Sequence, residues 1–146
     1  MPSVHRSEPV PVPCEVAWAL VADMSRMGEW VAPLRRVDLL PEGPAGVGVV
    51  RRIHPKGLPV TMEERIVEWE EGRRYAYRLV KEPWPFHDYL STVWVEPEAG
   101  GCRIHWAARW EMAPGAAARL ATGLVTRVMD TFYGRALRRA RARLSG

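Results

Sequence analysis

A carboxylate near the middle of a predicted strand is the first feature of this sequence that could take part in chemistry. Glu64 lies in the predicted strand Val60–Trp69, and a turn at residues 70–72 leads into the next strand, Arg73–Lys81. A hairpin closed through this turn pairs residues across the two strands. The pairs that it predicts are Glu68 with Tyr75, Ile66 with Tyr77 and Glu64 with Leu79.

This register places Glu64 on the inner face of the sheet, where a carboxylate needs a partner. A buried carboxylate is costly unless it is paired or protonated. Arg51 or Arg52, on the neighbouring predicted strand, would supply the opposite charge. Two interpretations follow. In the first, Glu64 forms a structural ion pair or lies on a solvated face. In the second, the pair lines a pocket and orients a polar group of a ligand.

Other proton-transfer candidates are few. His87 is followed by Asp88 and Tyr89, and imidazole, carboxylate and phenol groups can act as general acids and bases. Neighbours in a strand point to opposite faces, so His87 and Asp88 do not readily form a dyad. The alternative to a catalytic His87 is a polar residue of a pocket wall or rim. Glu64, His87 and Tyr77 are therefore the candidate catalytic residues. No histidine or cysteine spacing typical of a metal site occurs, and no metal or cofactor is predicted.

Aromatic residues are predicted to gather on the same inner face. Side chains alternate along a strand, so Ile104, Trp106, Ala108 and Trp110 share one side, and Tyr75 and Tyr77 share a side in their strand. The cluster is either core packing or a stacking wall for a flat or polyene ligand. Met24, Met27 and Trp30 follow on a short helix and could form an adaptable lid.

These residues need a scaffold, which the turn signals outline. A loose strand, Val4–Val12, precedes two short helices, Glu15–Val21 and one that Asp23 caps and that ends near Trp30. Six strands with short connections follow, which indicates an antiparallel meander. Their predicted ranges are 37–40, 47–54, 60–69, 73–81, 87–95 and 102–112.

A last helix, from Pro114 to about Leu144, is the only element long enough to cover this sheet. It would be a rod of roughly 45 Å. Its apolar stripe is expected to face the sheet, and a curved sheet on one helix tends to leave a gap that suits a small molecule. The stripe comprises Leu120, Leu124, Val125, Val128, Met129, Phe132, Ala136 and Ala140.

Composition excludes several classes of protein. The chain of 146 residues is 47% hydrophobic, which suits one domain over residues 1–146. No apolar run reaches the length of a membrane span, and no signal peptide is visible. The net charge of +4 arises from five arginines in residues 132–146, where a helix end favours cations. A nucleic-acid partner is therefore not expected. The two cysteines, Cys14 and Cys102, form no CxxC pair, which favours a reducing cytoplasm.

The order of elements resembles the START-like (SRPBCC, helix-grip) superfamily, and most of all its polyketide cyclase/dehydrase branch. The likeness spans almost the whole chain and is specific for the fold rather than for the function. The segments that carry it are residues 10–13, 16–21, 27–30, 43–48, 51–52, 64–68, 75–79, 88–89 and 103–106. The resemblance implies an α+β fold in which a curved antiparallel sheet of about seven strands wraps a long C-terminal helix, with two short helices after the first strand.

The resemblance also implies where particular side chains lie. It places Tyr89, Ser91, Val93 and Val95 inside, which leaves Leu90 and Trp94 outside, on a homodimer surface or under a loop. It brings the first and last strands together and so Cys14 near Cys102, although a reducing compartment disfavours a disulfide. The expected ligand-binding residues are Met27, Trp30, Arg51, Glu64, Ile66, Tyr75, Tyr77, Tyr89, Ser91, Trp106, Trp110 and Val128.

Three functions remain open on these residues. The first is the binding of a hydrophobic small molecule, lipid-, polyketide- or isoprenoid-like, between sheet and helix, where burial of apolar area drives affinity. The second is an aromatase/cyclase or dehydratase that uses the same cavity. The third is a protein- or ribosome-interaction module that acts through the arginine-rich end of the last helix.

Overall fold

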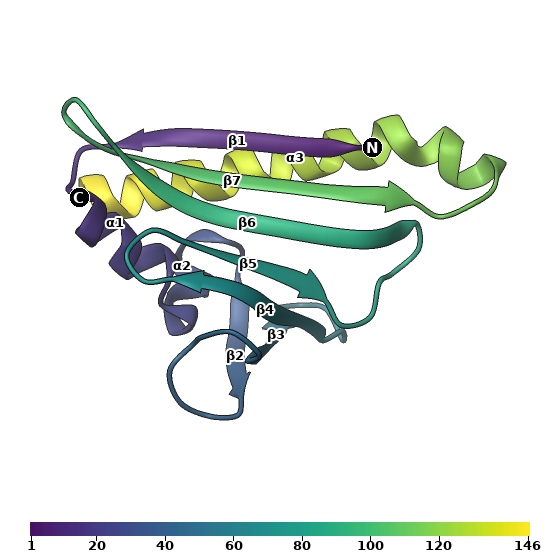
Figure 1. Ribbon diagram of the computed structural model, residues 1–146, viewed down its shortest axis with the longest axis horizontal. Coiled ribbons are helices and arrows are strands. Elements are labelled where there is room, and N and C mark those ends of the chain that lie inside the picture. The colour runs from purple at the N-terminus through teal and green to yellow at the C-terminus, as the bar shows by residue number, and fades with distance from the viewer.

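The computed structural model describes residues 1–146 and confirms the predicted α+β helix-grip fold. Seven antiparallel strands form one sheet in the order β1-β7-β6-β5-β4-β3-β2. The helix α3 (Ala116–Ser145) runs alongside β1 and β7, and α1 and α2 lie near its C-terminal end (Figure 1). The remaining elements are β1 (Ser3–Val10), α1 (Cys14–Val21), a 3-10 helix η1 (Met24–Arg26), α2 (Met27–Trp30), β2 (Leu34–Leu40), β3 (Val50–Pro55), β4 (Met62–Glu70), β5 (Arg74–Leu79), β6 (Phe86–Glu98) and β7 (Gly101–Met112).

The β4–β5 hairpin has the predicted register only near its open end. Glu64 pairs with Leu79 and Ile66 with Tyr77, as expected. A β-bulge between Ile66 and Glu68 then shifts the register, so Tyr75 lies opposite Trp69 and the predicted pairing with Glu68 is wrong. The shift lets the rings of Trp69 and Tyr75 stack, with their centroids 5.4 Å apart.

The predicted inner face of β6 and β7 is confirmed by burial. Along β7 the predicted inner residues Ile104, Trp106, Ala108 and Trp110 are buried, and along β6 Tyr89, Ser91, Val93 and Val95 are buried. Cys102 is buried as well, and so is His105 of the outer face. On the outer face Leu90 and Trp94 are half-buried rather than bare. The His105 ring stacks on Trp94 at 4.6 Å, so a neighbouring strand covers this tryptophan. Burial, and then the nearby His5, lower the pKa of His105.

The expected packing stripe of α3 is wrong in part. Leu120, Leu124, Val128 and Phe132 are exposed. Their exposure falls from 86% at Leu120 to 40% at Phe132, because successive steps of four residues rotate the row by about 40° each and only its last member approaches the sheet. The residues of α3 that are buried are Ala118, Tyr133, Gly134, Ala136, Leu137 and Ala140, and Val125 and Met129 are half-buried against the core.

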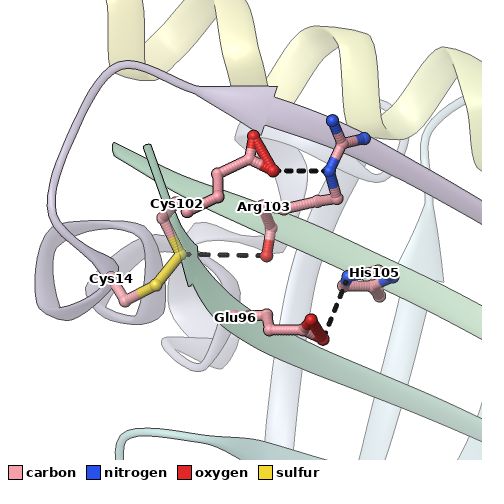
Figure 2. The surroundings of a disulfide bond; sticks show 6 residues. Cys14, Glu96, Cys102, Arg103 and His105 are labelled. Carbon is pink, nitrogen blue, oxygen red and sulfur yellow. Dashed lines mark hydrogen bonds and ion pairs between the residues drawn. A yellow bond between two sulfur atoms is a disulfide. The ribbon is translucent and has the colours of Figure 1, made fainter. Parts of the chain in front are cut away.

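A disulfide joins the start of α1 to the start of β7 (Figure 2). Cys14 and Cys102 are 88 residues apart in sequence, and their Cα atoms are 5.0 Å apart. The expectation that both thiols stay free is therefore wrong. It rested on the compartment, whereas adjacent β1 and β7 bring the two cysteines within bonding reach.

Among the helices, none combines the length and the apolar character that a membrane span needs.

Candidate functional site

A buried ion pair occupies the centre of the inner face. Arg51 on β3 lies opposite Glu64 on β4 in the register of the sheet. Its Nε donates to Glu64 Oε1 at 2.6 Å, and the two side chains are 2% and 8% exposed. Arg52, the other predicted partner, points the opposite way and pairs with the half-exposed Glu63. Strand alternation thus decides which arginine meets Glu64.

Aromatic rings and a thioether complete the surroundings of Arg51. The Arg51 guanidinium lies 4.1 Å from the centre of the Tyr77 ring and 5.6 Å from that of Tyr75. Its Nη1 donates to Met24 Sδ at 3.1 Å. Burial alone would lower the pKa of Arg51, but the charge of Glu64 raises it above its ordinary value. Burial raises the pKa of Tyr75 and, more strongly, of Tyr77, so both phenols stay protonated.

A second polar cluster joins α3 to the sheet. The hydroxyls of Tyr89 and Tyr133 lie 2.6 Å apart, and Ser91 Oγ lies 2.9 Å from Tyr133 Oη. Trp106 Nε1 donates to Ser91 Oγ at 2.8 Å, and the Tyr133 ring stacks on Trp106 at 3.8 Å. Burial raises the pKa of Tyr89 to about 12. This cluster fixes the middle of α3 over β6 and β7.

Trp30 packs its ring edge-on against Trp106, with the ring centres 5.4 Å apart. It is 1% exposed, and its Nε1 is buried without a hydrogen-bond partner. A buried N–H without a partner is uncommon and costs about 1–3 kcal/mol. Trp30 therefore offers one free donor inside the molecule.

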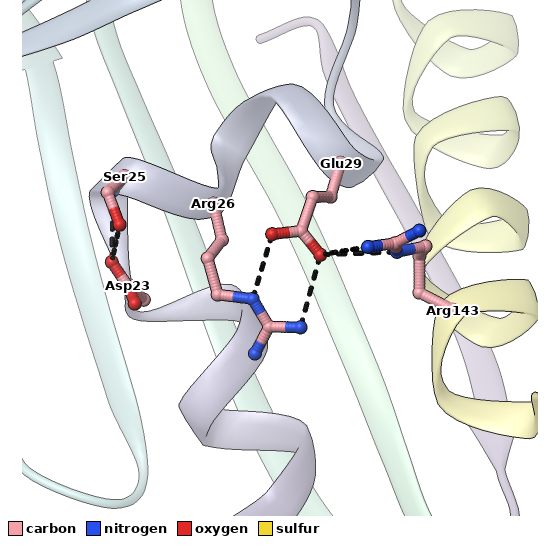
Figure 3. A network of polar contacts seen from close by, with 5 residues as sticks. All are labelled: Asp23, Ser25, Arg26, Glu29 and Arg143. Atoms are coloured by element: carbon pink, nitrogen blue, oxygen red, sulfur yellow. Dashed lines mark hydrogen bonds and ion pairs between the residues drawn. The ribbon is translucent and has the colours of Figure 1, made fainter.

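An ionic clasp holds the helix of Trp30 against α3 (Figure 3). Glu29 accepts hydrogen bonds from Arg26, the last residue of η1, and from Arg143 of α3, at distances of 2.8–3.1 Å. These bonds lower the pKa of Glu29 to about 2. Asp23 caps η1 by accepting from the Ser25 backbone N–H, as the sequence predicted.

Most of the expected ligand-binding residues lie together but are packed. Eleven of the twelve are buried, and only Val128, at 57% exposure, is not. Side chains of Trp30, Trp106 and Tyr133 fill the space between α3 and the sheet, where an open gap was expected. The gap closes because aromatic side chains from both layers meet there.

The three candidate catalytic residues do not form one group. Glu64 and Tyr77 lie on adjacent strands around Arg51. His87 is 71% exposed and lies 4.0 Å from Glu82, so it faces solvent rather than this pair. Tyr133 is a further residue of the site, and the apolar stripe predicted from the sequence contained its neighbour Phe132 instead. Val125, Met129 and Tyr133 recur at intervals of four residues, and this helical spacing could have indicated that Tyr133 faces the sheet.

Several open hollows lie outside this packed centre, and two of them border residues of the site. One, of about 450 Å³, follows α3 and is lined by Leu124, Arg127, Val128, Thr131, Phe132, Arg135 and Arg139. The other, of about 300 Å³, lies between η1, β2 and the loop after β2, and Met24 forms part of its wall. Phe132 links the first hollow to the interior because the centre of its ring lies 6.0 Å from the centre of the Trp106 ring.

Comparison with known proteins gives a family and a fold. The family model described as "Polyketide cyclase / dehydrase and lipid transport" matches residues 1–145. No curated protein matches the sequence. Among solved structures, the protein XoxI from Bacillus cereus has 20% identity and a TM-score of 0.78, with 99% of this chain and 96% of that chain covered.

Two further structures have the same fold. A protein from Thermus thermophilus has 18% identity and a TM-score of 0.75, with 98% of this chain and 97% of that chain covered. The di-domain ARO/CYC BexL from the BE-7585A biosynthetic pathway has 17% identity and a TM-score of 0.80, with 99% of this chain and 50% of that chain covered. At these identities the likeness concerns the fold.

Proposed function

Because the chain belongs to the polyketide cyclase/dehydrase and lipid transport family, we propose that it binds a hydrophobic small molecule between α3 and the concave face of its sheet. The ligand class is lipid-, polyketide- or isoprenoid-like. The aromatic inner face supplies the apolar contact area, at about 25 cal/mol for each Å² removed from water.

The observation that carries this proposal is the uneven packing of α3. Between Ala118 and Tyr133 no residue of the helix is buried, whereas five residues from Tyr133 to Ala140 are buried in the core. Segments with few buried contacts open at low free energy. The first half of α3 can therefore move away from β6 and β7 while its second half stays in place.

Such an opening would expose groups suited to a ligand with a polar end. Trp106 and Phe132 lie at the boundary between the α3 hollow and the interior. The unpartnered Trp30 Nε1 could donate a hydrogen bond, and the Arg51–Glu64 pair lies further along the same face. Polar groups in an apolar pocket fix ligand orientation more than they add affinity.

Titration with N-phenyl-1-naphthylamine, an uncharged fluorophore, tests the proposal. We expect saturable binding with one site per chain. Met129→Trp, which enlarges a half-buried side chain on the sheet side of the first half of α3, should weaken binding by about tenfold, a loss of about 1.4 kcal/mol. Leu120→Trp on the same helix is the matched control, because Leu120 is 86% exposed. Absence of saturable binding, or equal binding by both variants, would refute the proposal.

Hydrogen exchange gives a second readout of the same idea. Amides in the first half of α3 should exchange faster than those after Tyr133, because fewer buried contacts hold them. Binding of the fluorophore should slow the exchange of the first half selectively. A uniformly protected helix would contradict a movable first half.

A cyclase or dehydratase is the second candidate function, and the closeness of Tyr77 to the Arg51–Glu64 pair favours it. A protonated Tyr77 is a proton donor, and Glu64 is a candidate acceptor. Tyr77→Phe should abolish turnover of a poly-β-ketone thioester while fluorophore binding is retained. Unchanged turnover in this variant would remove Tyr77 from the mechanism.

We further propose that the protein acts in the cytoplasm and forms a homodimer. The Cys14–Cys102 disulfide tests the location, because such a bond is uncommon in a reducing compartment. Non-reducing mass spectrometry of the protein from intact cells would decide whether the bond forms at its place of function.

A further inference from the structure

The exposed apolar row on α3 has no partner within the molecule. Leu120, Leu124, Val128 and Phe132 are 86%, 68%, 57% and 40% exposed. They follow one another at intervals of four residues, so they form one continuous strip along the first half of the helix. A contiguous apolar strip of this kind, rimmed by polar residues, marks an interaction surface.

Arginines flank this strip and lack acidic partners. Residues 116–145 contain seven arginines against one aspartate, Asp130, a net charge of +6. Asp130 pairs with Arg6 of β1, and only Arg141 and Arg143 have carboxylate partners, Glu8 and Glu29. The exposed arginines of α3 without a carboxylate partner are Arg119, Arg127, Arg135, Arg138 and Arg139.

The strip and the arginines belong to one face rather than to separate ones. The open hollow of about 450 Å³ along α3 is lined by Leu124, Val128 and Phe132 together with Arg127, Arg135 and Arg139. An apolar strip bordered by arginines on a long helix has the character of a helix that lies in a membrane interface.

We propose that this face of α3 binds the surface of an anionic phospholipid membrane. The apolar strip would enter the boundary between headgroups and acyl chains, and the arginines would contact lipid phosphates. A second copy of the chain is a poorer occupant, because it would bring one +6 helix against another. The inference rests in part on the proposed function: the ligand-binding site opens beside the same half of α3, so a membrane-bound molecule would exchange ligand with the bilayer.

Vesicle flotation tests the docking directly. The protein should float with vesicles of phosphatidylcholine mixed with phosphatidylglycerol and should stay unbound with phosphatidylcholine alone. Binding should fall steeply as salt approaches about 1 M, where the Debye length is about 3 Å. Equal binding to both vesicle types, or none to either, would overturn the proposal. Fluorophore binding in solution is measured separately, so failure of the ligand-binding proposal is distinguishable from failure of docking.

Two pairs of variants separate the apolar and ionic contributions. Leu124→Asp should abolish flotation, whereas Val16→Asp, at an exposed apolar position of α1, should not. Arg127→Gln combined with Arg135→Gln should weaken binding by about 25-fold, since each arginine near the surface contributes about fivefold. Arg73→Gln combined with Arg109→Gln removes the same charge elsewhere and should have a smaller effect. If the two double variants weaken binding equally, net charge rather than this face is responsible, and the assignment is wrong.

Discussion

At the scale of single residues, Glu64 and Arg51 place two charges in the core of a small domain. Their mutual bond at 2.6 Å offsets the loss of water, but replacement of such a pair by apolar residues is often neutral or stabilising. The pair is therefore weak support for stability as such. Because the pair lies on the face nearest the proposed site, we propose that it orients a ligand rather than adding stability.

Removal of one partner alone should destabilise the protein strongly. Glu64→Gln leaves the Arg51 charge buried without a counterion, and we expect the free energy of unfolding to fall by about 3–5 kcal/mol. Urea unfolding at neutral pH measures this. The double variant Arg51→Met with Glu64→Leu should recover most of the loss. A double variant as unstable as Glu64→Gln would mean that the carboxylate matters for packing rather than charge.

The same residues show what the sequence can predict at this scale. Glu64 and Tyr77 could be placed because a short hairpin fixes their register locally. The bulge after Ile66 could not, because it depends on how Trp69 packs on Tyr75 in the folded sheet. Tyr133 was missed because two neighbouring rows of α3 are apolar, and only the sheet decides which one it buries.

At the scale of elements, the two glycines inside α3 have different surroundings. A Cβ on Gly123 would meet no atom within 4 Å, whereas a Cβ on Gly134 would lie 2.6 Å from Arg6 Nη2. Gly123→Ala should raise the free energy of unfolding by up to about 1 kcal/mol, the difference in helix propensity. Gly134→Ala should gain less or lose stability, because Arg6 must leave Asp130. Thermal unfolding of both variants checks this order, and equal gains would contradict it.

The clasp between α2 and α3 should depend on pH. The arginines lower the pKa of Glu29 from 4.5 to about 2. A depressed carboxyl pKa stabilises the fold above the unfolded-state value, and the contribution disappears as pH falls through the folded-state value. The stability difference between wild type and Glu29→Gln should thus be constant near neutrality and shrink between pH 4.5 and about 2. A difference that is unchanged by pH would contradict the ionic clasp.

The scale of the whole molecule is where the sequence was most informative. Strand alternation and turn residues predicted the element order and the inner face, because these depend on a repeat of two residues that any packed sheet must satisfy. Whether the space under α3 is open or filled was not predictable. It depends on how Trp30, Trp106 and Tyr133 meet across two layers, which no local pattern encodes.

The Cys14–Cys102 disulfide joins α1 to β7, two elements that are far apart in the sequence. It closes a loop with a sequence separation of 88, for which loss of unfolded-state entropy predicts a stabilisation of at most about 5 kcal/mol. Cys14→Ala with Cys102→Ala should therefore lower the urea midpoint without changing the fold. Dithiothreitol should lower the midpoint of the wild type by a similar amount and leave the double variant unaffected. If the reductant leaves the wild type unaffected as well, either the bond does not form or it contributes nothing to the stability of the helix-grip fold.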